Sequence, residues 1–329
     1  MQIVVEGLVK SFRVAERDPG MLGALRGIVA RRHRIVRALD GIGFALEAGE
    51  LVGYIGPNGA GKSTTVKILA GILVPDAGRV EVLGRVPWRQ RIAHVRDIGV
   101  VFGQRTQLWW DLPVIESLDM LRHIYRVPAE AFRRSKDELI ELLDLDGILA
   151  TPVRQLSLGQ RMRADLAASL VHAPPILFLD EPTIGLDAVS KLAVRDFIRR
   201  LNRERGVTVV LTTHDMDDIE ALCQRVLIIS GGGIVLDGTL TQLRAHVSGE
   251  RWLTVDIDDG SAAQVADPDA RVIRCEGHRV CLAFDPKQVS PAVLIGRITG
   301  RHPVRDLFVE NPPIENLIAR LYAEASRTS

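Results

Sequence analysis

Residues 56–64 have the sequence GPNGAGKST, which fits the pattern G-x-x-x-x-G-K-[ST] of a phosphate-binding loop. The apolar stretch LVGYIG precedes it and the helical pattern STTVKILAGI follows, which is the context that this motif requires. Glycines let the backbone wrap around an anion, so that several N–H groups and a helix N-terminus point at it. Lys62 would reach the β- and γ-phosphates of a nucleotide, and the Ser63 hydroxyl would ligate Mg²⁺. A glycine-rich turn with a chance Lys-Ser pair is the alternative, and the full match in this context disfavours it.

Polar side chains end three other apolar stretches. Asp180 and Glu181 end ILFLDEP, where Asp180 is predicted to bind Mg²⁺ and Glu181 to act as general base for an attacking water. His214 ends LTTH and would contact a γ-phosphate and hold that water, while Gln104 in VVFGQRTQ would sense Mg²⁺ or the water. Each residue alone also fits a solvated strand end or a structural histidine, so the prediction depends on their combination with the phosphate loop.

A second loop also has the residues of an anion site. The sequence QLSLGQRMRADLA, residues 155–167, opens as a loop and continues as a helix. Ser157, Gly159 and Gln160 could hold an anion at the start of that helix. One nucleotide does not need two such sites in one chain. The sequence therefore raises the question of which molecule's phosphate binds at the second loop.

The elements that must position these residues follow an α/β pattern. Short apolar runs such as ILFLDEP and VTVVLTTH alternate with amphipathic helical patterns, which is typical of a buried parallel sheet. Helical periodicity dominates from about Pro87 to Val171, which predicts an inserted helical subdomain. After about Ser248, short strand and helix patterns indicate a small α+β appendage. We therefore expect one domain at 1–245 and a second at 246–329.

Composition limits the class of protein. The 329 residues are 47% hydrophobic and 25% charged, with a net charge of +1, so bulk electrostatics do not suggest a nucleic-acid partner. The three cysteines show no metal-ligand spacing. No apolar run is long enough to span a bilayer, and the first residues lack the pattern of a signal peptide. We expect any membrane role to come through a partner or through surface contact.

Over roughly residues 1–240, these motifs occur in the order found in the nucleotide-binding subunit of an ATP-binding cassette (ABC) transporter, which the sequence resembles. The resemblance implies a P-loop NTPase core with an antiparallel β subdomain and an inserted helical subdomain, plus the α+β C-terminal appendage. It identifies Leu156–Gln160 as the signature, Gly185–Asp187 as the D-loop and Gln104 as the Q-loop glutamine, and it places Phe12 where the family stacks an aromatic ring on adenine. The implied ligands are ATP and Mg²⁺. The residues expected to bind ATP are Phe12, Gly56, Pro57, Asn58, Gly59, Ala60, Gly61, Lys62, Ser63, Thr64, Ser157, Gly159, Gln160 and Asp187; the expected metal ligands are Ser63, Gln104 and Asp180, and the catalytic residues Glu181, His214 and Gln104.

The resemblance also answers the question of the second loop. In the family, two cassettes pair head to tail, and the phosphate loop of one and the signature of the other hold the same ATP. The sequence departs from the family pattern Leu-Ser-Gly-Gly-Gln, because Leu158 replaces the first glycine. We expect its side chain to point away and to leave Ser157, Gly159 and Gln160 in place. An inactive cassette is the alternative, and Glu181 with His214 weighs against it.

A single cassette without a membrane span implies separate permease subunits, a second ABC subunit and a location at the cytoplasmic face of the membrane. We expect a homodimer, and a pair with a related second cassette is the alternative. In TQLWWDLP, Trp109 and Trp110 lie where the family faces the permease; we expect one to pack inward and the other to contact the partner. The segment 13–36 is longer than the turn that the family usually has at this position. They form either a basic amphipathic surface for lipid or an acidic partner, or a solvated excursion packed on its own domain.

The long first turn, the FGQRTQLWWDLP and LSLGQRMR stretches and the appendage together resemble the type 2 exporters that include daunorubicin-resistance ATPases. This resemblance implies export of a hydrophobic drug, lipid or polysaccharide. The alternative is a soluble cassette ATPase acting on the ribosome or on nucleic acid. Such proteins usually carry two cassettes or long coiled-coil insertions, which this chain lacks.

Overall fold

The computed structural model describes residues 1–15, 33–103, 105–247, 249–258 and 261–328. The chain divides into two compact units, Met1–Thr239 and Leu240–Ser329, which are described separately below. Within the described residues, no helix is both long enough and apolar enough to cross a membrane.

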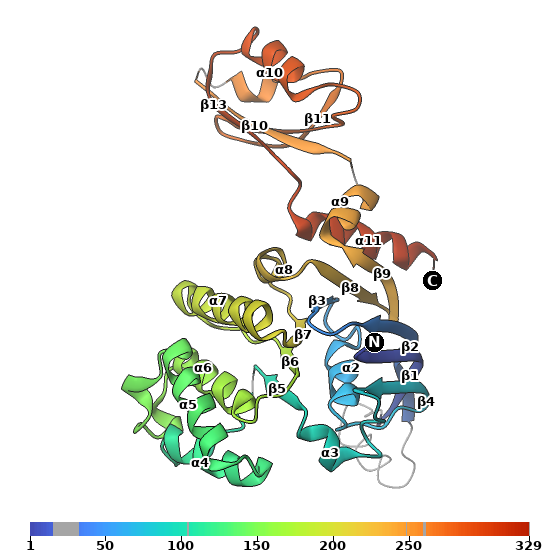
Figure 1. The fold of residues 1–329 in the computed structure, drawn as a ribbon. Helices are drawn as coiled ribbons and strands as arrows, with labels where there is room; N and C mark the ends of the chain where they lie inside the picture. Colours follow the sequence, from blue (N-terminus) through green and yellow to red (C-terminus); the bar gives the residue numbers. More distant parts are fainter. Residues whose placement is uncertain (16–32, 104, 248, 259–260, 329) are drawn as a thin grey trace, which may run out of the picture. The chain divides into compact units, whose positions relative to one another are not determined.

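A six-stranded sheet forms the centre of the first unit (Figure 1). Its order is β5-β6-β7-β3-β8-β9; neighbouring strands from β5 to β8 run parallel, and β9 pairs antiparallel with β8. The parallel strands are almost entirely buried, which explains their continuous apolar sequences. The strands are β3 (Leu51–Ile55), β5 (Ile98–Phe102), β6 (Ile176–Asp180), β7 (Thr208–Thr212), β8 (Arg225–Ser230) and β9 (Gly233–Thr239).

A second, antiparallel sheet of order β2-β1-β4 packs against the first sheet through α2. Val66, Ile68 and Leu69 of α2 are buried in one core with residues of both sheets, such as Leu46 and Phe178. The helix α2 is thereby fixed with its first turn at the end of β3. The elements are β1 (Ile3–Ala15), β2 (His33–Leu46), β4 (Ala77–Val82) and α2 (Lys62–Leu69).

The helices α4, α5 and α6 lie side by side and form the helical part of the first unit (Figure 1). The strand β5 belongs to the six-stranded sheet although it lies within the range 87–171, so the continuous helical region runs only from α4 to α6. The helices α4 and α5 each begin after a proline and end at a residue in the left-handed conformation. The remaining helices of this unit are α3 (Arg91–Val95), α4 (Val114–Tyr125), α5 (Ala129–Leu143), α6 (Leu158–Leu170), α7 (Ala188–Arg205) and α8 (Met216–Leu222), with 3₁₀ turns at Asp146–Ile148 and Val153–Gln155.

The second unit has the predicted α+β content. Its antiparallel sheet has the order β11-β12-β10-β13, and alternate residues such as Leu253, Val255 and Phe284 pack against Leu294 and Ile298 of α10. The helices α9 and α11 contact each other. The elements are α9 (Leu240–Val247), β10 (Arg251–Ile257), β11 (Ala270–Glu276), β12 (Arg279–Phe284), α10 (Pro291–Thr299), β13 (Val304–Glu310) and α11 (Ile314–Thr328), with a 3₁₀ turn at Ser261–Gln264.

Candidate functional site

The phosphate loop connects β3 to α2, and its glycines are required by its shape. Gly59 and Gly61 have φ angles of 82° and 107°, in the left-handed region. A Cβ on Gly61 would lie 2.5 Å from the Ala38 carbonyl oxygen, and one on Gly56 would lie 2.6 Å from that of Ile229. Both contacts are shorter than any real carbon makes. The loop therefore packs against β2 and β8. Of the other predicted residues, Pro57, Asn58 and Ala60 lie in the loop, and Ser63 and Thr64 lie in the first turn of α2.

Lys62 begins α2 and lies across the loop with only 6% of its surface exposed. Its Nζ donates to the carbonyl oxygens of Gly56 and Pro57, at 2.6 and 3.2 Å. Burial lowers the pKa of Lys62, and the charges of Glu181 and Asp180 act in the opposite direction. No side chain caps this helix, because its N-cap is a glycine. The first N–H groups of α2 are thus available to an anion.

Asp180 ends β6 beside the loop. The Ser63 hydroxyl donates to Asp180 Oδ1 at 3.2 Å, and the Thr212 hydroxyl donates to the same oxygen. Thr212 was not among the predicted site residues. A signal for it existed, since it ends the neighbouring parallel strand β7 and pairs in register with Asp180.

Glu181 and His214 meet beyond these strand ends. His214 Nδ1 lies 3.4 Å from Glu181 Oε1, and the two side chains are 57% and 24% exposed. Glu181 has a φ of 56°, which is uncommon for a residue other than glycine and costs about 1–3 kcal/mol. Its N–H donates to the Thr212 carbonyl oxygen at 2.9 Å. The strained backbone turns the Glu181 carboxylate out of the strand and toward His214.

Asp218 on α8 is a further residue that the sequence prediction missed. Its carboxylate is completely buried and accepts hydrogen bonds from the hydroxyls of Thr183 and Thr213, and it pairs with Arg195. Thr183 lies two residues after Glu181, and Thr213 lies directly before His214. Asp218 therefore connects the two backbone segments that carry Glu181 and His214. In the sequence, the acidic residues that follow LTTH were the feature that could have pointed to Asp218.

The second loop has a different geometry. Ser157 is the N-cap of α6: its Oγ accepts from the Gln160 N–H at 3.2 Å, and Gln160 Oε1 accepts from the Ser157 N–H at 2.9 Å. Gly159 is buried, and a Cβ there would lie 2.4 Å from Ser190 Oγ. The Leu158 side chain packs over Gly185, with Cδ2 3.0 Å from where a Cβ on Gly185 would be.

The remaining predicted residues lie on other elements. Asp187 is the N-cap of α7 and accepts from the Ser190 N–H and hydroxyl, which lower its pKa. Phe12 is half-buried on β1, and the Lys10 ammonium lies 5.6 Å from the centre of its ring. Trp110 is 51% exposed, whereas Trp109 is half-buried. Gln104 and most of the segment 13–36 lie outside the described residues, so their predicted roles stay predictions.

The structure thus brings Lys62, Ser63, Asp180, Glu181 and His214 together at one edge of the sheet. It gives the second loop other neighbours, since α2 contacts β2 and β6, whereas α6 contacts α4, α5, α7 and β5.

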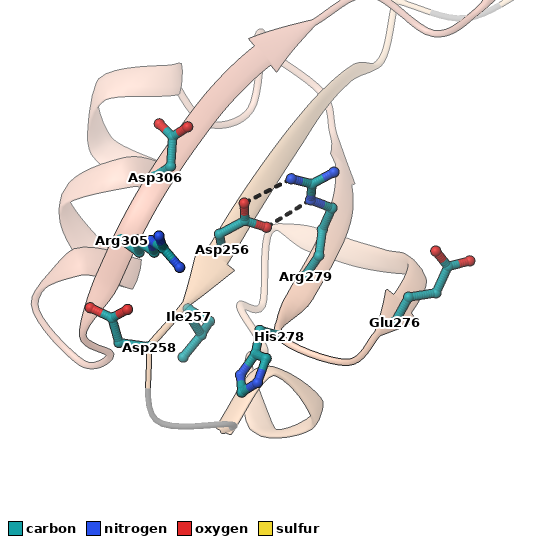
Figure 2. A pocket seen from close by; sticks show the side chains of 8 residues that line it. All are labelled: Asp256, Ile257, Asp258, Glu276, His278, Arg279, Arg305 and Asp306. Atoms are coloured by element: carbon teal, nitrogen blue, oxygen red, sulfur yellow. Dashed lines mark hydrogen bonds and ion pairs between the residues drawn. The ribbon is translucent and has the colours of Figure 1, made fainter.

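A pocket of about 600 Å³ in the second unit has other chemistry (Figure 2). Asp256 and Arg279 form a two-pronged ion pair at 2.7 and 2.8 Å, which lowers the pKa of Asp256. The other polar residues that line it are Asp258, Glu276, His278, Arg305 and Asp306. Acidic and basic side chains are mixed there and the acids outnumber the arginines, so the lining does not suit an anion.

Known proteins resemble this chain in sequence and fold. The sequence profile of the ABC transporter family matches residues 39–184. The daunorubicin resistance ATP-binding protein DrrA3 of Streptomyces coeruleorubidus is 39% identical over 67% of this chain and 69% of its own length. The Nod factor export ATP-binding protein I of Rhizobium meliloti (strain 1021) is 34% identical over 86% of this chain and 83% of its own. The dimeric ATP-binding cassette MJ0796, solved in a post-hydrolysis state bound to ADP and Pi, has a TM-score of 0.59 and 26% identity over 72% of this chain and 98% of that one.

These matches confirm the predicted resemblance to the daunorubicin-resistance branch and the predicted fold class. They favour the transporter prediction over the alternative of a soluble cassette protein acting on the ribosome or on nucleic acid. The chain therefore belongs to the ABC transporter family, as one of its ATP-binding and ATP-hydrolysing subunits.

Proposed function

We propose that two copies of this chain pair head to tail around two ATP molecules, and that each site takes its phosphate loop from one copy and its signature loop from the other. The observation that supports the proposal is the difference between the N-termini of α2 and α6, called here the α2 start and the α6 start. The α2 start has a buried lysine and adjacent carboxylates, whereas the α6 start has an exposed serine that forms a capping box with Gln160. Each helix start offers what the other lacks.

In the proposed reaction, the N–H groups of the loop and Lys62 bind the phosphates of ATP. Glu181 accepts a proton from the attacking water, and His214, held beside it, orients that water toward the γ-phosphorus. The Ser157 hydroxyl of the partner copy still has its own proton to donate to the γ-phosphate, because its oxygen only accepts within the cap. Phe12 is proposed to stack on the adenine, and Asp187 to lie at the junction of the two copies.

Ser63 and Asp180 are proposed to hold Mg²⁺, with Gln104 as a third ligand. The fit is chemical: a hydroxyl and a carboxylate oxygen lie 3.2 Å apart beside the phosphate loop, and oxygen ligands are those that Mg²⁺ prefers. Bound there, the ion would neutralise charge on the β- and γ-phosphates. Thr212 would keep the Asp180 carboxylate oriented.

The energy of ATP binding and hydrolysis is proposed to drive a separate permease at the cytoplasmic face of the membrane. Relatives are named for daunorubicin resistance and Nod factor export, which supports export of a hydrophobic drug, lipid or polysaccharide. The exposed Trp110 is the residue that we expect the permease to contact, since aromatic side chains dominate many interfaces.

The dependence of ATPase activity on protein concentration tests the composite site. Turnover per chain should rise steeply as the concentration passes through the dimer dissociation constant, and should fall toward zero on dilution. A rate per chain that stays constant down to concentrations at which light scattering finds only monomer would reject the proposal. Purification of the chain from its native membranes, with identification of the accompanying proteins, tests the permease separately.

A further inference from the structure

Asp165 is a carboxylate on α6 within the otherwise apolar run ADLAASL, and only 4% of its surface is exposed. The Thr106 hydroxyl donates to Asp165 Oδ1 at 2.8 Å, and the Gln107 N–H donates to the same oxygen at 3.0 Å. The Gln107 side-chain amide donates in turn to the Asp165 carbonyl oxygen at 3.0 Å. Because a buried carboxylate is strongly destabilising without partners, these bonds fix the chain at 106–107 to the signature helix.

The same stretch of chain continues into the tryptophans. We call residues 105–114 the Trp segment. Its second half is hydrogen-bonded to the 3₁₀ turn Val153–Gln155 that precedes α6. The Arg154 N–H donates to the Trp110 carbonyl oxygen at 2.9 Å and the Val153 N–H to that of Leu112 at 3.1 Å. Arg161 lies one turn before Asp165 on α6. Its guanidinium is 5.8 Å from the centre of the Trp110 ring.

The signature loop is at the near end of this helix. Ser157 precedes Asp165 by eight residues, which is about 12 Å along an α-helix. A helix segment of this length moves as a rigid rod, so a displacement of the Trp segment is carried to Ser157 if the segment is fixed to α6. The hydrogen bonds of Asp165 fix one end of the segment directly to α6. The backbone hydrogen bonds at 153 and 154 tie the other end to the 3₁₀ turn that leads into the signature loop.

We propose that Asp165 is a positioning residue that couples the Trp segment to the signature loop through its hydrogen bonds with Thr106 and Gln107. The inference rests on the proposed function and adds how the permease contact is linked to the ATP contact. Trp110, which would contact the permease, and Ser157, which would contact ATP, belong to one hydrogen-bonded unit. By linkage, binding at either end then affects the order of the other end.

Hydrogen exchange in the full chain, with Glu181→Gln to prevent turnover, tests the coupling by using Mg-ATP as the probe. The amides to follow are those of Trp109, Leu112 and Val114, which donate hydrogen bonds in the structure, and not that of Gln107, which loses its own acceptor in the variants. We expect Mg-ATP to slow their exchange by at least about fivefold. This factor is at the lower end of the range in which a ligand commonly changes the behaviour of a distant site. Adding Asp165→Ala should abolish this slowing while the signature residues 157–163 stay protected by ATP.

Three variants sharpen the result. Asp165→Asn should restore the slowing, because its amide oxygen can accept both hydrogen bonds, and Thr106→Val should reduce it even if Asp165→Ala does not fold. Asp119→Ala, which removes an exposed acid of α4, should leave it unchanged. The inference is overturned if Asp165→Ala keeps the slowing, if Asn fails to restore it, or if the parent shows none. Failure of the parent to bind a fluorescent ATP analogue is the separate result that would overturn the proposed function.

Discussion

The two helix starts proposed to bind phosphate, those of α2 and α6, differ in nearly every physical respect. The α2 start has a glycine N-cap, no side-chain cap and a lysine that is 6% exposed. The α6 start is closed by a capping box between Ser157 and Gln160, and Ser157 is exposed. The carboxylates Asp180 and Glu181 both act on Lys62 at the α2 start.

These differences indicate that the phosphate loop and the signature loop do not have the same role. The proposed role of the α2 start is to hold the triphosphate and to support hydrolysis, because its open N–H groups, its lysine and its carboxylates lie together. In the α6 start, the Gln160 N–H is already satisfied by the cap, so only the N–H groups of Leu158 and Gly159 and the Ser157 hydroxyl remain for an outside acceptor. Its proposed role is therefore to recognise the phosphate, whereas Glu181 at the α2 side is the proposed base for water. The following variants test this division of roles, in order of decreasing effect on turnover.

The largest effect should come from Glu181→Gln at the α2 side. Removing the general base should slow ATP hydrolysis by about 10²–10⁴-fold, while ATP still binds and the ATP-bound dimer accumulates. Steady-state phosphate release and size-exclusion chromatography with Mg-ATP measure the two results. Glu130→Gln, on an exposed first turn of α5, is the matched control and should hydrolyse ATP at the normal rate. A Glu181→Gln chain as fast as the unmodified one would remove Glu181 from the mechanism.

A smaller effect should come from Ser157→Ala at the α6 side. A hydrogen bond to a charged group contributes about 1.5–3 kcal/mol, so turnover should fall by roughly 10- to 100-fold. The lost cap should also lower stability by about 1 kcal/mol. Ser290→Ala removes the equivalent N-cap of α10, whose hydroxyl accepts from the Val293 N–H, and separates the two effects. We expect it to lower the melting temperature in the same way without changing turnover; equal losses of turnover in both variants would contradict the role of Ser157.

The sequence can predict where these residues lie in the fold, because they lie at ends of elements. Glycine spacing predicts the loop at 56–64, and apolar runs predict the strands that end at Asp180 and before His214. The positive φ of Glu181 and the packing of Leu158 on Gly185 could not be predicted, because they depend on neighbours distant in the sequence. The bonds of Asp165 and Asp218 are similar cases. Asp165 lies in a mostly apolar run and Asp218 in an acidic one, and neither pattern shows which residues the buried carboxylate contacts.

The smallest effect on turnover should come from Asp165→Asn, which instead changes how stability depends on pH. Burial raises the pKa of Asp165 from 3.8 to about 6, while Thr106, Gln107 and Arg161 act in the opposite direction. The folded chain therefore keeps this proton more tightly than the unfolded chain, so stability falls as pH rises from about 4 to about 6. The full difference corresponds to roughly 3 kcal/mol.

Asparagine does not ionise, so its advantage in melting temperature over the unmodified chain should grow between pH 5 and pH 7 and level off above. Thermal unfolding of both chains across this range measures it, and all other titrating groups cancel in the difference. An advantage that is the same at pH 5 and pH 8 would mean that Asp165 does not titrate as described.

The central claim is that each ATP site takes one helix start from each of two chains, and mixing two inactive variants tests it most directly. Lys62→Ala destroys the α2 start and Ser157→Arg destroys the α6 start, at a position exposed enough to accept the larger side chain. A mixed dimer contains one site with both defects and one site with none. An equal mixture should therefore regain about a quarter of the normal ATPase activity, if pairing is random and the two sites of a symmetric dimer act independently. A mixture as inactive as either variant alone, under conditions in which mixed dimers form, would contradict the claim.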